Sequence, residues 1–173
     1  MKRVIVASIL SFVLLLAFGM VAYGEMAKEG SLSGTNTYAG THKMIPLDKE
    51  RLILVYENMG VRTSDTGEGP FHGVSTRNQG IMYFEKGVGR LRGYIISVDK
   101  DGDKIIAELT EENSKLGGPP TSGTGKFIGG TGKFKGIQGK YEYTRQNMRP
   151  IAEGTHQAVS KFKGTYKIVE TKE

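Results

Sequence analysis

The pattern that most restricts the fold is a series of short segments in which apolar and polar residues alternate, separated by Gly, Asp, Asn and Pro. Period-two alternation is typical of β-strands with one buried face. No segment after residue 24 has the capped, ten-residue apolar stripe of an amphipathic helix. We therefore expect an all-β barrel or sandwich. The eight candidate strands are Leu32–His42, Arg51–Met59, Gly80–Phe84, Arg90–Val98, Lys104–Thr110, Ser122–Ile128, Ile137–Gln146 and Thr155–Val169.

Two of these segments indicate how their faces are used. In the last one, Ala158, Phe162, Tyr166 and Ile168 share one face, and lysines dominate the other, so we expect one buried and one wet side. The segment 51–57 is apolar on both faces. Since no helix is expected to cover its second face, we predict self-association as a dimer or trimer.

The first residues have the order of a secretory signal peptide. Lys2 and Arg3 precede an apolar run to Ala22, and the small residues of Ala22-Tyr23-Gly24 form a cleavage site. We predict a signal peptide over 1–24, a flexible leader over 25–30 and a barrel domain over 31–173. The alternative is an uncleaved membrane anchor, because the run is nearly long enough to span a bilayer. Cleavage would give an exported protein, periplasmic or extracellular, with no stable membrane insertion.

Charge and cysteine content exclude several classes of function. The net charge is +6, and removal of 1–24 takes two of the 24 basic residues and none of the 18 acidic ones, which leaves +4. The basic residues are interspersed with acidic ones, so we expect a solvated surface and no nucleic-acid partner. The absence of Cys excludes disulfides, thiolate metal sites and cysteine nucleophiles.

The segment Ser97–Lys104 predicts a hairpin. It places Asp101-Gly102 between two apolar segments, and such a pair supplies the positive φ angles of a tight turn. Asp99, Asp101 and Asp103 alternate as in a calcium loop, but Gly102 is at the fourth position where an EF-hand requires the sixth, and strands flank it. The turn is the favoured interpretation.

Glycine is concentrated in one region, where nine of the 25 glycines lie between Gly117 and Gly139. The region contains a tandem heptad, Gly-Thr-Gly-Lys-Phe-Ile-Gly at 123–129 and Gly-Thr-Gly-Lys-Phe-Lys-Gly at 130–136. Its spacing fits neither a phosphate loop nor a dinucleotide fingerprint. Glycines within strands mark bulges, sharp bends or close backbone approach. We expect a structural role, with Phe127 and Phe134 plugging the barrel or its end.

The run from Gly129 to Tyr141, Gly-Gly-Thr-Gly-Lys-Phe-Lys-Gly-Ile-Gln-Gly-Lys-Tyr, resembles a segment of plant dirigent proteins and of the wider allene oxide cyclase-like superfamily. It also resembles secreted bacterial proteins in which an Asp-x-Asp-Gly-Asp-Lys hairpin precedes that segment, as Asp99–Lys104 does here. The resemblance covers about a third of the chain. It implies a single eight-stranded antiparallel barrel of calycin type with a central apolar cavity, often trimeric. Cyclases and dirigent proteins of that superfamily act without a cofactor, and no match to their catalytic residues is present.

Candidate catalytic residues are few. His42, His72 and His156 lie far apart in the sequence without a metal-ligand pair, so we expect no metal site. His156 shares the inward parity of Phe162, which places it near a barrel mouth. Glu57 shares parity with Ile53 and Val55, and its pKa would be raised if that face were buried. A strand-end position, or a pair with Arg51, Arg90 or Arg92, is the favoured alternative for Glu57.

Candidate ligand-binding residues combine apolar bodies with polar tips, or share the inward parity of the last strand. The segment Gly60–Gly80, which contains His72, is long for a hairpin and is a candidate lid. The expected ligand-binding set is Tyr56, His72, Tyr94, Tyr141 and Phe162.

Three functions fit these observations. The first is an exported barrel that binds an apolar small molecule without covalent chemistry. The second is a cofactor-independent isomerase or cyclase of the allene oxide cyclase type, with Glu57 or His156 as acid–base group. The third is a structural envelope protein that self-associates. No cofactor is expected for any of them.

Overall fold

All eight predicted strands are present in the computed structural model, which describes residues 26–115 and 118–170. The predicted signal peptide lies outside the described residues. The described strands are generally longer than the sequence pattern predicts, because alternation continues into polar residues. They are β1 (Glu29–Pro46), β2 (Arg51–Ser64), β3 (Val74–Glu85), β4 (Val88–Val98), β5 (Lys104–Lys115), β6 (Thr121–Gly130), β7 (Ile137–Asn147) and β8 (Thr155–Ile168), with a short 3₁₀ turn η1 (Gly132–Phe134) before β7.

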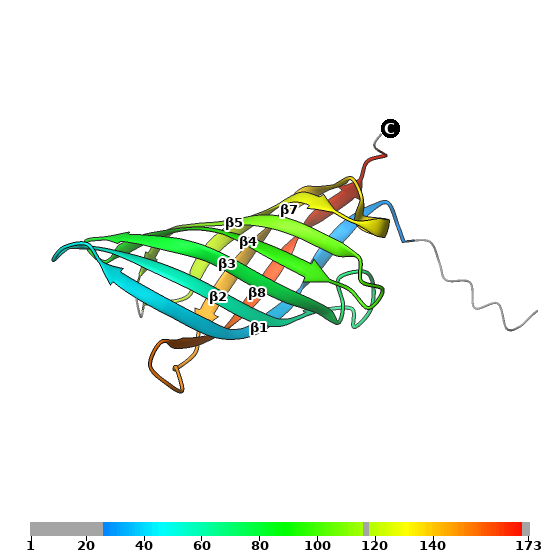
Figure 1. Ribbon diagram of the computed structural model, residues 1–173. Coiled ribbons are helices and arrows are strands. Elements are labelled where there is room, and N and C mark those ends of the chain that lie inside the picture. The colour runs from blue at the N-terminus through cyan, green and yellow to red at the C-terminus, as the bar shows by residue number, and fades with distance from the viewer. Residues whose placement is uncertain (1–25, 116–117, 171–173) are drawn as a thin grey trace, which may run out of the picture.

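The strands form a closed antiparallel barrel in sequence order (Figure 1). Each strand pairs with the next, and β1 closes the barrel by pairing with β8: Tyr38 is the register partner of both Gly60 and Ala158. The sandwich alternative is thereby eliminated and the predicted eight-stranded barrel is confirmed. Within the described ranges, no helix is long and apolar enough to cross a membrane.

One end of the barrel, which we term the closed end, is filled by aromatic side chains. It is the end at which the 65–73 loop, the 99–103 turn and η1 lie. The ring of Phe71 lies 6.1 Å from that of Phe127, 6.2 Å from that of Phe134 and 5.0 Å from that of Tyr166. Phe134 is completely buried. The predicted plug by Phe127 and Phe134 is confirmed, and Phe71 joins it from the loop that was a candidate lid. That loop seals the closed end and covers no opening.

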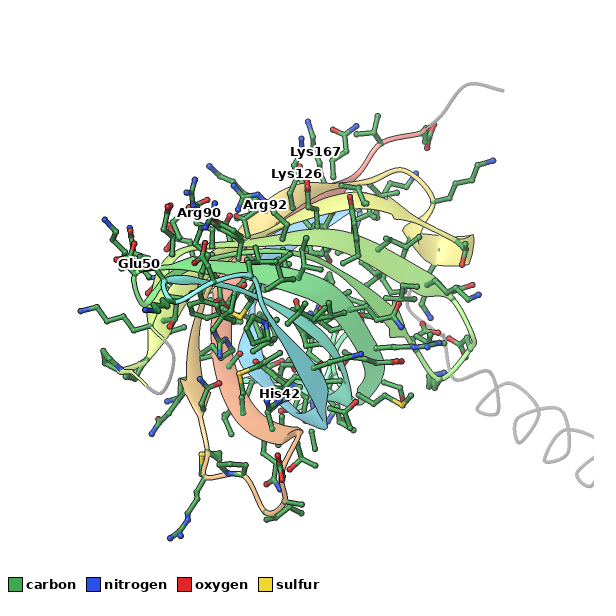
Figure 2. All side chains as sticks on the ribbon, turned by 60° about the vertical axis from the view of Figure 1, so that its left-hand side comes forward. His42, Glu50, Arg90, Arg92, Lys126 and Lys167 are labelled. Carbon is green, nitrogen blue, oxygen red and sulfur yellow. The ribbon has the colours of Figure 1, made fainter. Side chains whose placement is uncertain are left out.

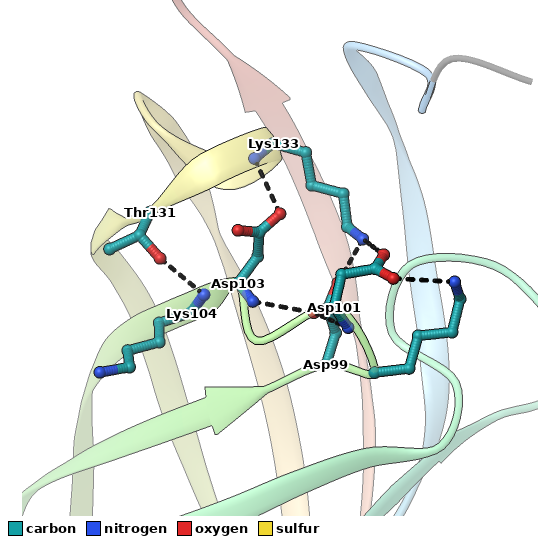
Figure 3. Close-up of polar contacts among 7 residues, drawn as sticks. Asp99, Asp101, Asp103, Lys104, Thr131 and Lys133 are labelled. Carbon is teal, nitrogen blue, oxygen red and sulfur yellow. Dashed lines mark hydrogen bonds and ion pairs between the residues drawn. The ribbon is translucent and has the colours of Figure 1, made fainter. Parts of the chain in front are cut away.

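The aspartate-rich hairpin and the second glycine heptad contact each other at this closed end (Figure 3). The Asp99 carboxylate accepts the backbone N–H groups of Asp101 and Asp103 at 2.9 Å, and Gly102 has a φ of 85°. The Lys133 ammonium forms ion pairs with Asp99 and Asp101, and the Lys133 backbone N–H donates to Asp103. The predicted hairpin turn is therefore confirmed, but Gly102 alone of the Asp101-Gly102 pair has a positive φ. The carboxylates of the turn bind a cation of the chain itself.

The glycines of β6 allow aromatic rings of β7 to lie against the inner barrel wall. A Cβ at Gly125 would lie 2.1 Å from Cζ of Tyr141, and one at Gly123 would lie 2.5 Å from Cζ of Tyr143. No side chain can occupy those positions without displacing a ring. Of the structural roles expected for the first heptad, these two glycines serve close approach: a ring of β7 lies directly against the backbone of β6.

The outer surface combines charged residues with an apolar area. Arg90, Arg92, Lys126 and Lys167 lie on the outside of the barrel (Figure 2). The outward face of β2 exposes Val55, Met59 and Val61. This is the second apolar face expected from the sequence of segment 51–57.

Candidate functional site

The other end of the barrel, which we term the open end, contains a cavity of about 260 Å³. It lies where the 47–50, 86–87 and 148–154 connections join the strands. One part of its wall is apolar, formed by Leu54, Met82, Phe84 and Leu91. Met148 and Pro150 add apolar lining from the 148–154 connection. The polar and charged part is formed by Tyr38, His42, Tyr56, Asn58, Asn78, Glu111, Lys115, Arg145, Asn147, Thr155 and His156. The cavity can therefore hold a molecule with both apolar and polar parts.

A buried ion pair forms part of the polar wall. Arg145 of β7 contacts Glu111 of β5 through two hydrogen bonds, from Nε to Oε1 at 2.9 Å and from Nη2 to Oε2 at 2.7 Å. Ser114 donates a third to Glu111 at 2.9 Å. Burial lowers the pKa of Arg145, but the hydrogen bonds and charge of Glu111 outweigh this effect and raise it. The pair is fully engaged, so neither group is available as a free acid or base.

Two tyrosines face the cavity and are held by hydrogen bonds. Tyr38 Oη lies 3.2 Å from Oγ of Ser160, and Tyr56 Oη donates to Oδ1 of Asn78 at 3.2 Å. Burial raises the pKa of both phenols. These hydroxyls therefore stay protonated, and their oxygens keep the capacity to accept a further hydrogen bond in the cavity.

Two histidines lie at the cavity mouth. His156 of β8 lies beside His42 of β1 (His42 is labelled in Figure 2), and their ring centroids are 5.7 Å apart. Nε2 of His156 is 3.4 Å from Nδ2 of Asn58, whereas its Nδ1 is buried without a hydrogen-bond partner among the described residues. Burial, His42 and Arg145 lower the pKa of His156. Its neutral ring therefore dominates at pH 7.

A second, smaller chamber of about 30 Å³ lies deeper in the barrel, between the cavity and the aromatic plug. It shares Tyr38 and Asn78 with the cavity as lining residues. Arg62 enters it from β2, and its guanidinium carbon lies 4.9 Å from the ring centroid of Phe162 and 5.5 Å from that of Tyr141. The interior thus changes from an open, mixed cavity through a cationic chamber to a packed plug.

The structure brings only some of the predicted site residues to these chambers. His156 and Tyr56 line the cavity, and Tyr141 and Phe162 line the inner chamber. Tyr94 is 57% exposed on the outside of β4. His72 is exposed in the loop at the closed end, where its Nδ1 accepts the Ser64 backbone N–H. Tyr94 and His72 therefore contribute nothing to the cavity.

Glu57 also lies outside the cavity. It faces outward on β2 and pairs with Arg77 at 2.6 Å, and this hydrogen bond lowers its pKa. The buried face required for a raised pKa is absent at this position, so Glu57 is not placed to act on a cavity ligand. The cross-sheet partner is Arg77, and not Arg51, Arg90 or Arg92.

Three charged interior residues were not predicted: Arg62, Glu111 and Arg145. Arg62 and Glu111 lie beyond the ends that we predicted for their strands, at Met59 and Thr110. Continuing the parity of Tyr56 along β2 reaches Arg62, and continuing that of Leu109 along β5 reaches Glu111. Arg145 has the parity of Tyr141 and Tyr143 within its predicted strand. The alternation of inward and outward residues along each strand was therefore the signal that could have found all three.

Among the described residues, no group of His, Cys, Asp and Glu can hold a metal ion.

No protein-family model and no curated protein matches this sequence. Solved structures do match. The pterocarpan synthase dirigent protein GePTS1 is similar with a TM-score of 0.51 and 12% identity, over 87% of this chain and 92% of that one. The pterocarpan synthase dirigent protein PsPTS1 has a TM-score of 0.47 and 14% identity, over 86% of this chain and all of that one. At such identity the first match is informative about fold alone. The chain folds as a dirigent-like barrel.

Proposed function

We propose that this protein binds a small amphipathic molecule in the cavity at the open end, without covalent chemistry. The observation that carries the proposal is the cavity itself. It is about 260 Å³, near the lower limit of roughly 300 Å³ for small-molecule sites, and it combines an apolar wall with hydrogen-bonding tyrosines. The ligand expected from the sequence was apolar. The polar wall favours one that also carries a polar group.

The proposal is tested with a neutral fluorescent dye, N-phenyl-1-naphthylamine, and two matched methionine variants. Met82 lines the cavity, whereas Met59 is 60% exposed on the outside. We expect the wild type to bind the dye, Met82→Trp to lose at least about tenfold in affinity because the indole fills the cavity, and Met59→Trp to bind normally. Absence of dye binding, or equal binding by both variants, would contradict the proposal. Native mass spectrometry would identify a co-purified ligand.

An isomerase or cyclase of the allene oxide cyclase type is the second candidate. Glu57 is no longer available to it, and His156 is the remaining acid–base group of the predicted pair. Support comes from the neutral His156 ring at the cavity mouth, with its unpartnered Nδ1. If a turned-over substrate is found, His156→Asn should remove turnover and leave ligand affinity within a few fold. Unchanged turnover would eliminate this role.

Export and self-association stay predictions. We propose cleavage after Gly24. A mass measurement of the secreted chain would test this, because the cleaved chain begins at Glu25.

A structural envelope role, or any homo-oligomer, would use the outward face of β2, where Val55, Met59 and Val61 are exposed. Light scattering of the wild type and Met59→Lys is the corresponding measurement. A wild-type monomer would contradict self-association.

A further inference from the structure

Arg62 is a buried cation without a counter-ion. It is 2% exposed, and no carboxylate lies within ion-pair distance of it in the described part of the chain. Its Nε is buried without a hydrogen-bond partner among these residues. Among the described residues, Glu111 is the one carboxylate that lines either chamber, and both of its oxygens bond to Arg145. The interior therefore holds two guanidinium groups against one carboxylate.

The surroundings of Arg62 offset only part of the cost of burying its charge. The rings of Phe162 and Tyr141 lie within cation–π distance. Such contacts are much weaker than the hydration that a buried charge loses. Buried polar groups in native proteins are nearly always paired, so an unpaired guanidinium needs an explanation.

A second unpaired group lies beside Arg62 and restricts the class of ligand that would fit the inner chamber. The Tyr141 hydroxyl is also buried, and its proton has no acceptor among the described residues, because the adjacent Arg62 can only donate. Both groups line the same chamber, and both can donate. Burial raises the pKa of Tyr141 and outweighs the lowering by Arg62, so the phenol keeps its proton. Two adjacent donors, one of them cationic, match an anionic acceptor with two oxygens.

We propose that the inner chamber is a carboxylate site, and that the ligand is an amphipathic monocarboxylate whose head group contacts Arg62 and Tyr141. The inner chamber, about 30 Å³, exceeds the roughly 10–15 Å³ that one water requires, so it admits a small head group. Tyr38 and Asn78 line both chambers, so the two are adjacent. In the proposed complex, the apolar body of the same molecule lies in the wider cavity against Leu54, Met82 and Leu91. The inference rests on the proposed function, because it assigns the polar end of that ligand.

The test uses probes that share an eight-carbon chain and differ in the head group: octanoate, 1-octanol and octyltrimethylammonium. Isothermal titration should show octanoate binding at least about tenfold more tightly than 1-octanol, with octyltrimethylammonium weakest. Acetate should bind far more weakly than octanoate, because it lacks the apolar body. Equal affinities of octanoate and 1-octanol would overturn the carboxylate site and leave cavity binding intact. Failure of all three eight-carbon probes to bind would overturn both proposals.

Variants of Arg62 and Tyr141 test whether the carboxylate head group binds in the inner chamber. Arg62→Gln should remove the preference for octanoate over 1-octanol, and Tyr141→Phe should reduce it several-fold. Arg77→Gln, which removes an outward-facing arginine, should retain it. A preference that survives Arg62→Gln would overturn the assignment.

A thermal measurement separates a binding role of Arg62 from a structural one. Without ligand, Arg62→Met should melt at or above the wild-type temperature, because it removes an uncompensated buried charge. Octanoate should raise the melting temperature of the wild type and not that of the variant. If Arg62→Met melts well below the wild type and Tyr141→Phe binds octanoate normally, Arg62 is structural and the proposal fails.

Discussion

The two ends of the barrel are built from the same eight strands but are filled in opposite ways. At the closed end, the ring of Phe71 packs against the rings of Phe127 and Phe134. At the open end, the inward positions carry an ion pair, two histidines and hydrogen-bonding tyrosines around a cavity. The side chains that pack the core and the polar side chains that line the cavity are therefore separated along the barrel axis.

This separation has an energetic basis. A packed aromatic core contributes stability in proportion to the apolar surface that it buries. Charged groups in a barrel interior contribute little net stability, because the lost hydration offsets their attraction. The closed end therefore stabilises a fold whose open end tolerates polar, partly unpaired groups.

Deletion of one aromatic side chain at each end gives the largest contrast. Phe134→Ala should lower the free energy of unfolding by about 3–5 kcal/mol, because the ring is fully buried and its loss leaves a void. Phe84→Ala should lower it less, since Phe84 already borders the cavity. Urea denaturation of both variants measures the difference. Equal losses would mean that the open end is as tightly packed as the closed end.

Breaking the interior ion pair should have the next largest effect. Arg145→Met leaves Glu111 buried and uncompensated, which should reduce the free energy of unfolding by about 3 kcal/mol. The double variant Arg145→Met, Glu111→Leu should regain most of it, because apolar replacements of both partners remove the unpaired charge. The control Arg77→Gln removes an exposed pair and should change stability by less than about 1 kcal/mol. A double variant no better than the single one would refute this account.

The tightness of packing in the barrel wall between the two ends can be compared at two glycines of β6. Gly125→Ala should destabilise by about 1–3 kcal/mol, because its Cβ would overlap the Tyr141 ring. Gly129→Ala has open space around the new methyl group and should change stability by less than about 0.5 kcal/mol. Thermal denaturation of the two variants compares them directly. Similar melting temperatures would show that the wall yields easily.

The smallest effect is a pH dependence at the open end. The folded state lowers the pKa of His156, so below about pH 6.5 the unfolded state binds the proton more readily. This contribution to stability is present above that pH and is lost as the pH falls through the folded-state pKa. His156→Asn should flatten melting temperature against pH between pH 7.5 and 5. If melting temperature depends on pH as steeply in His156→Asn as in the wild type, the pH dependence does not come from His156.

Sequence patterns predicted the fold better than the site, for reasons seen in particular residues. Alternation located all eight strands because each has one regularly buried face. It misplaced Glu57 because segment 51–57 is apolar on both faces, so parity alone did not tell inside from outside. Arg62 and Glu111 escaped prediction because polar residues were taken as strand ends. The pairing of Glu111 with Arg145 depends on a contact between β5 and β7, and the lack of a carboxylate near Arg62 depends on the strands that face β2 across the barrel. No local pattern encodes either.

The seam between β1 and β8 determines when the cavity comes into existence. It joins residues more than a hundred positions apart, such as Tyr38 and Ala158, and His42 and His156 reach the mouth from its two sides. The other strand pairings join consecutive strands, so this distant pairing carries the largest loop-closure cost of the barrel and is expected to form after them. Until the seam closes, β1 and β8 are open edges that can pair with other chains. The cavity and the protection of these edges from aggregation therefore arise together, when the barrel closes.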